Sequence, residues 1–520
     1  MLDTQVRSST LVGAPLPAPA ARSLGELLPR AAATGRGIVL IGADGAEERL
    51  GYTELYIKAL RALGGLRARE VPPGSPVVLQ LAEPHELLTA FWACVLGGLL
   101  PVPLSAAAPA GELDRVRRAL GDPWLLTDRP EEGRWLGPVG ELAGPNAEPA
   151  PGGWDDPAVL VLTAGSSGAP KAVRLSHGNL ITRSQGTALD NGLDGASRTF
   201  NWMPLDHVSG LVMFHVRDTL AGCTQIHARK DWVLADPLRW LDVVDRHRVD
   251  TTWSVNSSFD LVSDLLEQGA RRDWDLSCLR YVMSGGQAVK ARTVRRFLAA
   301  LAPYGLAPGA VRPGWGMSET ASGIVDHRAD LSRLADTDRY VPVGRPHPGV
   351  SVRVVDEAGR VVPEGALGHL QVSGQPVFAG YFGTSPDAET FTPDGWFRTG
   401  DLAFVSDGAL TVTGSADDSV SLAGAHCHGH EIESAVEELP GALRHCTAAF
   451  LADGELVVCY SPAPGADRVA LAARITALVR ERFGVPVSHV VPVAEDEVPR
   501  TGTGKPKRAE LRASFRSKSL

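Results

Sequence analysis

The sequence predicts an α/β protein with a large N-terminal domain of sheets packed with helices and a small, mobile C-terminal α+β domain. Up to about residue 413, short β-branched runs alternate with amphipathic stretches, as in sheets covered by helices. After Gly414 the pattern changes to a unit of roughly a hundred residues, a size that folds alone. We expect a flexible arm at 1–20, a core domain at 21–413 and a C-terminal lid domain at 414–520.

The elements of the core domain follow from its apolar runs. Strands are expected at 77–81, 159–163 and 352–355, and a helix at 86–96. Residues 87–104 are apolar for eighteen residues, but Gly97-Gly98 and Pro101 interrupt the run. A buried helix followed by a turn and a strand therefore fits better than a membrane span.

The C-terminal unit carries its own helix and strand signals. A helix is expected at 430–439 and a strand at 455–460. Asp467 suits the N-cap of a further helix that ends near Phe483, before Gly484. The chain from Lys505 onward is basic, and we expect a partly mobile tail that either steers an acidic thiol partner or is simply solvated.

Charge and cysteine usage limit the possible partners and compartment. The net charge of -9 gives no electrostatic support for a nucleic-acid partner. The first twenty residues lack the apolar core of a signal peptide. Six cysteines stand far apart and form no disulfide framework, so we expect a reducing cytoplasm; they are Cys94, Cys223, Cys278, Cys427, Cys446 and Cys459.

The strongest local signal is the segment 163–171, in which a strand runs into a loop of glycines and hydroxyls that ends in a lysine. Glycines let the backbone approach phosphates, hydroxyls bind phosphate oxygens and the lysine offsets charge. The glycine spacing differs from that of a Walker A loop. The alternative is a surface hairpin turn. The residues concerned are Thr163, Gly165, Ser166, Ser167, Gly168 and Lys171.

Three further segments are weaker when each is taken alone. In 314–320, Trp315 can stack on a purine and Glu319 can hold Mg²⁺, although a buried tryptophan is the commoner explanation. In 399–401, Asp401 follows a tight turn and can accept both hydroxyls of a ribose, although most Gly-Asp pairs are only turns. In 499–505, a glycine- and threonine-rich loop ends in Lys505 and can bring a cation into a site, or it is a solvated loop.

Taken in this order along the chain, the four segments resemble the adenylate-forming superfamily of acyl-CoA synthetases, fatty acyl-AMP ligases and nonribosomal-peptide adenylation domains. The resemblance covers nearly the whole chain. It is strongest to the initiating ligase domains of polyketide–peptide assembly lines, because of four further segments. These are 91–98, 201–214, 236–242 and 430–433. Residues 51–55 and Gly380-Tyr381 also match.

The resemblance implies a role for each matching residue. Segment 163–171 would hold the β- and γ-phosphates of ATP, Glu319 the Mg²⁺ ion, Asp401 the ribose, and Lys505 would be the catalytic cation between the acid's carboxylate and the α-phosphate. The remaining ATP-site positions are Gly285, Gly286, Gln287, Trp315, Gly316, Met317 and Ser318. The acyl pocket positions are His207, Ser209 and Asn256, and Asp417 stands at the hinge.

The implied reaction joins a small organic acid to AMP and then transfers the acyl group to a thiol. The thiol is that of CoA or of the phosphopantetheine on a discrete acyl carrier protein, because we recognise no carrier domain in this sequence. Two departures stand at the domain junction: Ser415 replaces the family's ribose-binding arginine, and Asp417 stands where a lysine is common. Losing a charged hydrogen bond costs roughly 1.5–3 kcal/mol.

Two other functions fit the departures. An ATP-dependent diazotase would activate nitrite for an aryl amine, and a degenerate ligase would only bind a carrier protein; retention of Glu319, Asp401 and Lys505 speaks against the second. The histidines of 426–430 also invite a metal site, because alternation on a strand would place His426, His428 and His430 on one face. No second cluster completes a tetrahedral site.

Overall fold

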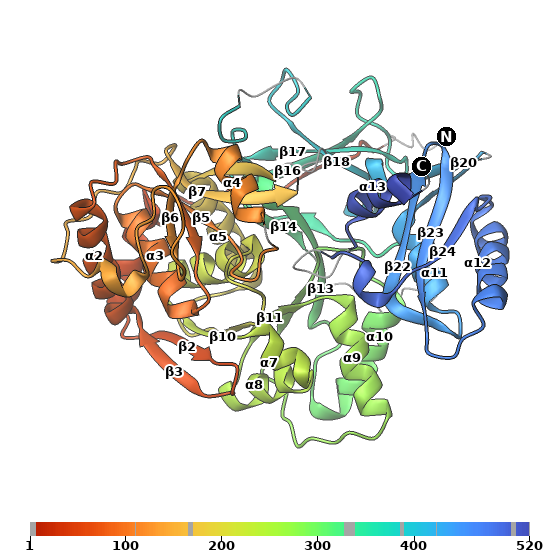
Figure 1. Ribbon diagram of the computed structural model, residues 1–520, viewed down its shortest axis with the longest axis horizontal. Coiled ribbons are helices and arrows are strands. Elements are labelled where there is room, and N and C mark those ends of the chain that lie inside the picture. The colour runs from red at the N-terminus through yellow and green to blue at the C-terminus, as the bar shows by residue number, and fades with distance from the viewer. Residues whose placement is uncertain are drawn as a thin grey trace, which may run out of the picture.

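The chain folds into a large N-terminal part of several sheets and a smaller C-terminal unit, which lies at the right of Figure 1 in blue. The computed structural model describes residues 7–109, 111–164, 170–326, 339–384, 389–422, 424–500 and 506–518. This confirms the predicted α/β class with a large N-terminal part.

The largest sheet has nine strands in the order β15-β14-β13-β12-β11-β9-β10-β2-β3, and its centre is parallel. Parallel strands end at one edge of a sheet, and loops at that edge commonly bind ligands. The strands are β2 Gly37–Ile41, β3 Glu47–Gly51, β9 Arg198–Asn201, β10 Thr224–Ala228, β11 Thr251–Ser254, β12 Tyr281–Ser284, β13 Val311–Met317, β14 Ser322–Asp326 and β15 Arg345–Pro346.

Three smaller sheets complete the N-terminal part. A parallel sheet contains β4 Pro76–Gln80, β5 Leu100–Pro103 and β6 Trp124–Thr127, and a hairpin contains β7 Pro157–Ala164 and β8 Pro170–Ser176. An antiparallel sheet contains β1 Thr10–Val12, β16 Val350–Val355, β17 Gly368–Gly374, β18 Phe397–Ser406 and β19 Ala409–Ser415. The strands predicted at 77–81, 159–163 and 352–355 are thereby confirmed as β4, β7 and β16.

The helices of the N-terminal part cover these sheets (Figure 1). They are α1 Leu27–Ala32, α2 Tyr52–Ala68, α3 Pro84–Leu96, α4 Glu112–Leu120, α5 His177–Asn191, α6 Arg217–Ala221, α7 Lys230–Ala235, α8 Arg239–His247, α9 Asn256–Glu267 and α10 Ala291–Leu301. The predicted helix at 86–96 is α3, and it is buried, as expected. Gly98 then adopts a φ of 66° and the chain turns into β5. Among the described residues, no helix is long and apolar enough to cross a bilayer.

In its described residues, 416–422, 424–500 and 506–518, the C-terminal unit has two small sheets and three α-helices. The strands are β20 Ser419–Leu422, β21 Ala425–His428, β22 Ala442–Ala452, β23 Glu455–Pro462 and β24 His489–Pro492; the helices are α11 Gly429–Glu437, α12 Arg468–Phe483 and α13 Arg508–Lys518. The side chain of Asp467 accepts hydrogen bonds from the backbone of Val469 and Ala470, and Gly484 ends α12 with a φ of 71°. The predicted caps of this helix are therefore confirmed.

Two sequence expectations about the chain ends were wrong. The arm at 1–20 is not loose throughout, because β1 pairs with the edge strand β16, with Leu11 opposite Val352. An open sheet edge offers backbone groups that a short segment of almost any composition can pair with. The basic tail is helix α13, and its Arg508 is buried against Glu433 and Asp418 at 2.7 and 2.6 Å.

The contact between the N-terminal part and the C-terminal unit is made by charges. Each apolar cluster among the described residues contains residues from only one side of Ser415 in the sequence. Ion pairs cross instead. Arg339 pairs with the buried Glu431, and four further pairs have N–O distances of 3.1 to 3.9 Å: Arg444–Asp264, Arg292–Glu438, His445–Asp260 and Lys290–Glu437. Burial raises the pKa of Glu437 to about 7, because Lys290 offsets only part of its desolvation.

Candidate active site

The parallel strands of the large sheet bring the predicted site residues to one edge. β9, β11 and β12 end at Asn201, Ser254 and Ser284. The segments that follow them carry His207 and Ser209, then Asn256, and then Gly285, Gly286 and Gln287. Because these strands are parallel neighbours, their following loops lie together, as expected for a binding site at the carboxyl edge of a sheet.

Trp315 and Asp401 come from two different sheets and form a direct hydrogen bond. The indole Nε1–H donates to the carboxylate Oδ2 over 2.8 Å. Trp315 stands in β13, where a β-bulge between Trp315 and Gly316 shifts the pairing with β14. Bulges re-aim side chains, and here the bulge lies at the indole that reaches the other sheet. The predicted adenine and ribose residues are therefore adjacent.

Gly316 is required by the close approach of two strands. A Cβ at this position would lie 2.2 Å from the carbonyl oxygen of Ser322, which no side chain tolerates. After the short 3-10 helix of residues 318–320, Ala321 and Ser322 have φ values of 52° and 100°. Such backbone conformations are costly outside glycine and cluster at functional sites. The tight return places Met317 and Ser318 beside the start of β14.

Glu319, Tyr381 and Lys171 form a second polar group. The Tyr381 hydroxyl donates to Glu319 Oε1 over 3.0 Å, and the Lys171 ammonium lies 4.9 Å from the centre of the Tyr381 ring. Burial raises the pKa of Glu319, whereas Tyr381 and Lys171 act in the opposite direction and Asp401 adds to the rise. A carboxylate this buried is suited to a cation that compensates its charge.

Only part of the predicted phosphate-binding segment lies within the described residues. Thr163 in β7 and Lys171 in β8 face each other across the hairpin, one before and one after the loop. Gly165, Ser166, Ser167 and Gly168 lie outside the described residues, as does Lys505. The glycine-rich loop and the predicted catalytic lysine therefore remain predictions.

Asn256 holds the loop that carries Gly285, Gly286 and Gln287. Its amide nitrogen donates to the carbonyl of Ala288 over 2.7 Å, and its amide oxygen accepts from the backbone N–H of Lys290 over 3.1 Å. Gly286 in this loop has a φ of 80°. Both ends of the Asn256 amide are used, so its effect on a bound acid is exerted through the loop that it positions.

His207 presents one defined tautomer. The backbone N–H and the hydroxyl of Ser209 both lie 3.1 Å from Nδ1, and the backbone group can only donate. Nδ1 is therefore the acceptor and the neutral ring carries its proton on Nε2. Burial lowers the pKa of His207, and the neighbouring Lys230 lowers it further, which keeps the ring neutral. Ser209 opens a π-helical segment, Ser209–Val216, of a kind common at functional sites.

A cavity of about 480 Å³ adjoins the segment that carries His207. Its lining includes Leu81 after β4, Pro84 and Leu87 at the start of α3, and Arg229 and Lys230 after β10. Two carboxylates, Asp206 and Asp231, lie in the same lining and offset the two cations. Sequence reasoning included Asp206 within a matching segment but missed Lys230, whose position directly after a parallel strand was the available signal.

The junction residues lie beside Asp401. Ser415 ends β19 and is paired with Asp401 of β18, and the predicted hinge residue Asp417 is exposed in a short 3-10 helix, Ala416–Asp418. Gly414 has a φ of 153°, and a Cβ on it would lie 2.8 Å from Nδ1 of His428. Glycine at 414 is therefore required by the buried ring beneath it.

The histidines of 426–430 do not form the predicted one-faced strand. β21 ends at His428, and His430 belongs to α11. The rings follow one another with centroids 5.4 and 5.5 Å apart, but His428 Nε2 is bonded to the hydroxyl of Thr413. Among the described residues, the one group of three possible metal ligands lies elsewhere.

Comparison with known proteins decides the family. The model of the AMP-binding enzyme family matches residues 27–382, which include Trp315, Glu319 and Tyr381 of the site. The chain belongs to the AMP-binding enzyme family. It is an adenylate-forming enzyme of the kind that activates acids as acyl-adenylates, and this confirms the resemblance found in the sequence.

Relatives of this AMP-binding enzyme include natural-product synthetases. The nonribosomal peptide synthetase apvA of Aspergillus terreus is 32% identical over 516 residues, which are 91% of this chain and 55% of apvA. McyG A-PCP complexed with phenylalanyl-adenylate superimposes with a TM-score of 0.91 at 31% identity, over 98% of this chain and 85% of that one.

A second solved structure is the adenylation domain of a keto acid-selecting nonribosomal peptide synthetase module bound to keto acyl adenylate. It matches at 32% identity with a TM-score of 0.77, over 93% of this chain and 100% of that one. The chain spans about half the length of the first curated relatives that it matches, which are 55% covered.

Proposed function

We propose that this AMP-binding enzyme activates an organic acid without an α-amino group, of the α-keto acid class, and passes it to a carrier-borne phosphopantetheine thiol. The observation that carries the nucleotide half of this proposal is the bond between Trp315 and Asp401. It joins the two residues expected at adenine and ribose although they stand in different sheets.

In the first half-reaction the acid's carboxylate attacks the α-phosphorus of ATP, and pyrophosphate leaves. Asp401 would accept hydrogen bonds from the ribose hydroxyls, and Trp315 would lie against the adenine. Glu319 would hold Mg²⁺, which when bound offsets the charge of the triphosphate. Burial raises the pKa of Glu319, and Tyr381 and Lys171 oppose that rise and so favour the ionised carboxylate that the ion needs.

Lys505 would supply the cation between the acid and the α-phosphate. A charge placed there acts mainly in the transition state, when both reacting groups are anionic. The second half-reaction would follow rotation of the C-terminal domain at Asp417. The thiolate attacks the acyl carbon, a thioester forms and AMP leaves.

The acid class is inferred from the polar groups at the carboxyl edge. An amino acid brings an ammonium group, which needs a nearby carboxylate without another partner. Among the described residues of the predicted acyl pocket, His207 and Ser209 are neutral and Asn256 holds a loop. The adjacent Asp206 is faced by Lys230. The solved keto acid-selecting relative supports the same class.

The acceptor is proposed to be a carrier protein rather than free CoA. In the lining of the cavity beside His207, the charges of Arg229 and Lys230 are offset by those of Asp206 and Asp231. The lining therefore has no excess positive charge for the phosphates of CoA. The solved structure of McyG A-PCP supports a carrier as well. The six cysteines form no disulfide with one another, which fits a cytoplasmic location.

The test is pyrophosphate exchange over matched acids that differ only at the α-carbon, such as phenylpyruvate and phenylalanine. We expect exchange with the keto acid and at least tenfold less with the amino acid, and acyl transfer to a phosphopantetheinylated carrier in preference to CoA. Preference for the amino acid would refute the acid class. Exchange only with nitrite and an aryl amine would favour a diazotase.

Lys505→Ala is the matched control for this assay. The variant should bind ATP and keep its melting temperature, yet lose exchange by orders of magnitude. A variant that exchanges at the wild-type rate would refute the assignment of Lys505, and a wild-type protein that exchanges with no acid would leave only the carrier-binding alternative.

A further inference from the structure

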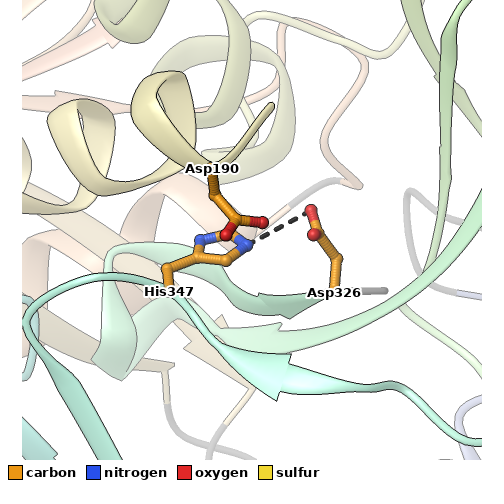
Figure 2. Close-up of side chains that lie close together, drawn as sticks. All are labelled: Asp190, Asp326 and His347. Carbon is orange, nitrogen blue, oxygen red and sulfur yellow. Dashed lines mark ion pairs between the residues drawn. The ribbon is translucent and has the colours of Figure 1, made fainter. Parts of the chain in front are cut away.

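A second polar cluster lies at the end of β14. Asp326 ends this strand, His347 follows β15, and Asp190 stands in the last turn of α5 (Figure 2). One ligand atom from each residue lies within 4.8 Å of the others. Asp326 and His347 are buried, whereas Asp190 is exposed and leaves the cluster open to solvent.

The tautomer of His347 follows from its neighbours. The hydroxyl of Thr187 donates its single hydrogen to the carbonyl of Arg183 over 3.1 Å. It also lies 3.1 Å from His347 Nδ1, and accepting there places the proton of the neutral ring on Nδ1, in agreement with a buried Nε2 that makes no hydrogen bond with the described residues. In the neutral ring, Nε2 then bears a lone pair. That lone pair points at the carboxylate oxygen of Asp326, 3.2 Å away.

A lone pair facing a buried carboxylate is repulsive unless a cation lies between them. Asp326 Oδ2 accepts from the hydroxyl of Tyr281 over 2.6 Å and from Asn191 over 3.3 Å, both of them neutral donors. Its other oxygen is buried and makes no hydrogen bond with the described residues. The cluster therefore has ligands for one more positive charge.

The neighbouring arginines are engaged by carbonyl groups. Arg312 donates to the side-chain oxygen of Asn191 and lies over the ring of Tyr281, 4.8 Å from its centre. Arg183 donates to the backbone carbonyls of Gly323 and Met213. Both stabilise the negative charge of Asp326 at longer range, but the hydrogen bonds named here are directed at these carbonyls.

We propose that Asp190, Asp326 and His347 bind a divalent transition-metal cation of the Zn²⁺ class. Imidazole nitrogen and carboxylate oxygen are both zinc ligands, and three protein ligands leave the fourth position to water. Two ligand atoms 3.2 Å apart fit zinc bonds of ~2.1 Å at an angle of about 100°, near tetrahedral. Thr187 would fix the ring from behind, as partners of metal-bound histidines do.

Such an ion would tie α5 and the segment after β15 to the sheet that carries the nucleotide residues. Asp326 pairs with Gly314 across β13 and β14, and Trp315 is the next residue in β13. At about 3.4 Å per residue, β14 places Asp326 ~14 Å from Ser322. The ion would therefore be structural and separate from the Mg²⁺ assigned to Glu319.

The experiment is a titration of Zn²⁺ alone, by calorimetry at pH 7.5, into tag-free enzyme that has been treated with a chelator. We expect one equivalent to bind with a Kd of ~1 µM or tighter, and the melting temperature to rise with Zn²⁺ concentration. Asp190→Asn should weaken binding at least tenfold without unfolding the protein, because Asp190 is exposed. His347→Gln should weaken it similarly.

His426→Ala is the matched control, because exposed histidines bind zinc unspecifically and His426 is exposed. It should leave the stoichiometry and the Kd unchanged. Co²⁺ in place of Zn²⁺ should give the visible absorption of a four-coordinate site in the wild type and not in Asp190→Asn. A Kd weaker than ~10 µM in the wild type, or binding lost in His426→Ala but kept in Asp190→Asn, would overturn the proposal in favour of a protonated His347.

Discussion

Ser415 lies directly opposite Asp401 in the antiparallel pairing of β19 with β18. Residues opposite each other in such a pair have side chains on the same face of the sheet, close enough to interact. Asp401 already accepts the indole N–H of Trp315 there. An arginine at 415 would consequently reach the group assigned to the ribose.

Ser415→Arg should therefore tighten ATP binding roughly tenfold, because it adds a charged hydrogen bond at the sugar. Isothermal titration of ATP measures the change. Ser415→Gln is the control of similar reach without charge, and it should bind ATP like the wild type. Weaker ATP binding together with lost activity in Ser415→Arg would show that the junction has been rebuilt for another task.

Tyr381→Phe should shift the acid limb of the pH–rate profile to higher pH. The lost hydroxyl stabilises the ionised form of Glu319, so its removal lets burial raise the pKa of this carboxyl further. The Mg²⁺ requirement should grow as the pH falls through that pKa, since a protonated carboxyl does not bind the ion. Profiles at two Mg²⁺ concentrations test this, and an unchanged acid limb would contradict the role given to Tyr381.

Glu437→Gln should remove a pH dependence from the stability of the protein. The pKa of Glu437 is about 7 in the folded state, above its ordinary value of 4.5. The folded state thus holds more protons between these values, and stability falls as the pH rises from 4.5 to 7. Between pH 4.5 and pH 7, the free energy of unfolding of the variant should therefore rise relative to that of the wild type by about 2–3 kcal/mol.

The measurement is calorimetric unfolding of both proteins from pH 5 to pH 7.5. The difference between the two curves isolates Glu437, because groups such as His445, whose pKa burial lowers to about 4, act on both proteins equally and in the opposite direction. A difference that does not change with pH would refute the raised pKa.

Arg508→Met should destabilise the C-terminal unit by about 3–5 kcal/mol, because it leaves Glu433 buried without its cation. The double variant Arg508→Met/Glu433→Gln should recover part of this loss. Thermal unfolding followed by far-UV circular dichroism measures both. A single variant as stable as the wild type would refute the burial of this pair.

The burial of Arg508 also changes how a role of the basic tail is best tested. Truncation after Lys507 would remove Arg508 and unfold its surroundings, so it does not report on partner binding. Neutralising Arg516, which is exposed and pairs with Asp453 at 2.6 Å, is the cleaner change. A salt-sensitive loss of acyl transfer would then indicate steering of an acidic partner.

Much of the fold could be predicted because its signals are local. The interrupted apolar run at 87–104 contains its own turn, and Asp467 and Gly484 mark the two ends of α12. The four site segments were equally visible, since each combines glycine with at least one functional side chain within nine residues.

The remaining features depend on contacts between distant segments. Arg508 looked like one charge in a solvated tail, because its partners Glu433 and Asp418 lie far away in the sequence. Asp190, Asp326 and His347 share no motif and meet only when α5 packs beside the large sheet. β1 forms because β16 offers an open edge, and its own composition does not demand a strand.

The charged contact between the N-terminal part and the C-terminal unit has a consequence for the size of the molecule in solution. Exposed pairs such as Arg444–Asp264 and Arg292–Glu438 are screened by salt, and no apolar cluster among the described residues spans the same boundary to replace them. Sedimentation at low and high ionic strength should therefore show a hydrodynamic radius that grows with salt, without any loss of secondary structure. The attachment of the C-terminal unit thus depends in part on the surrounding electrolyte.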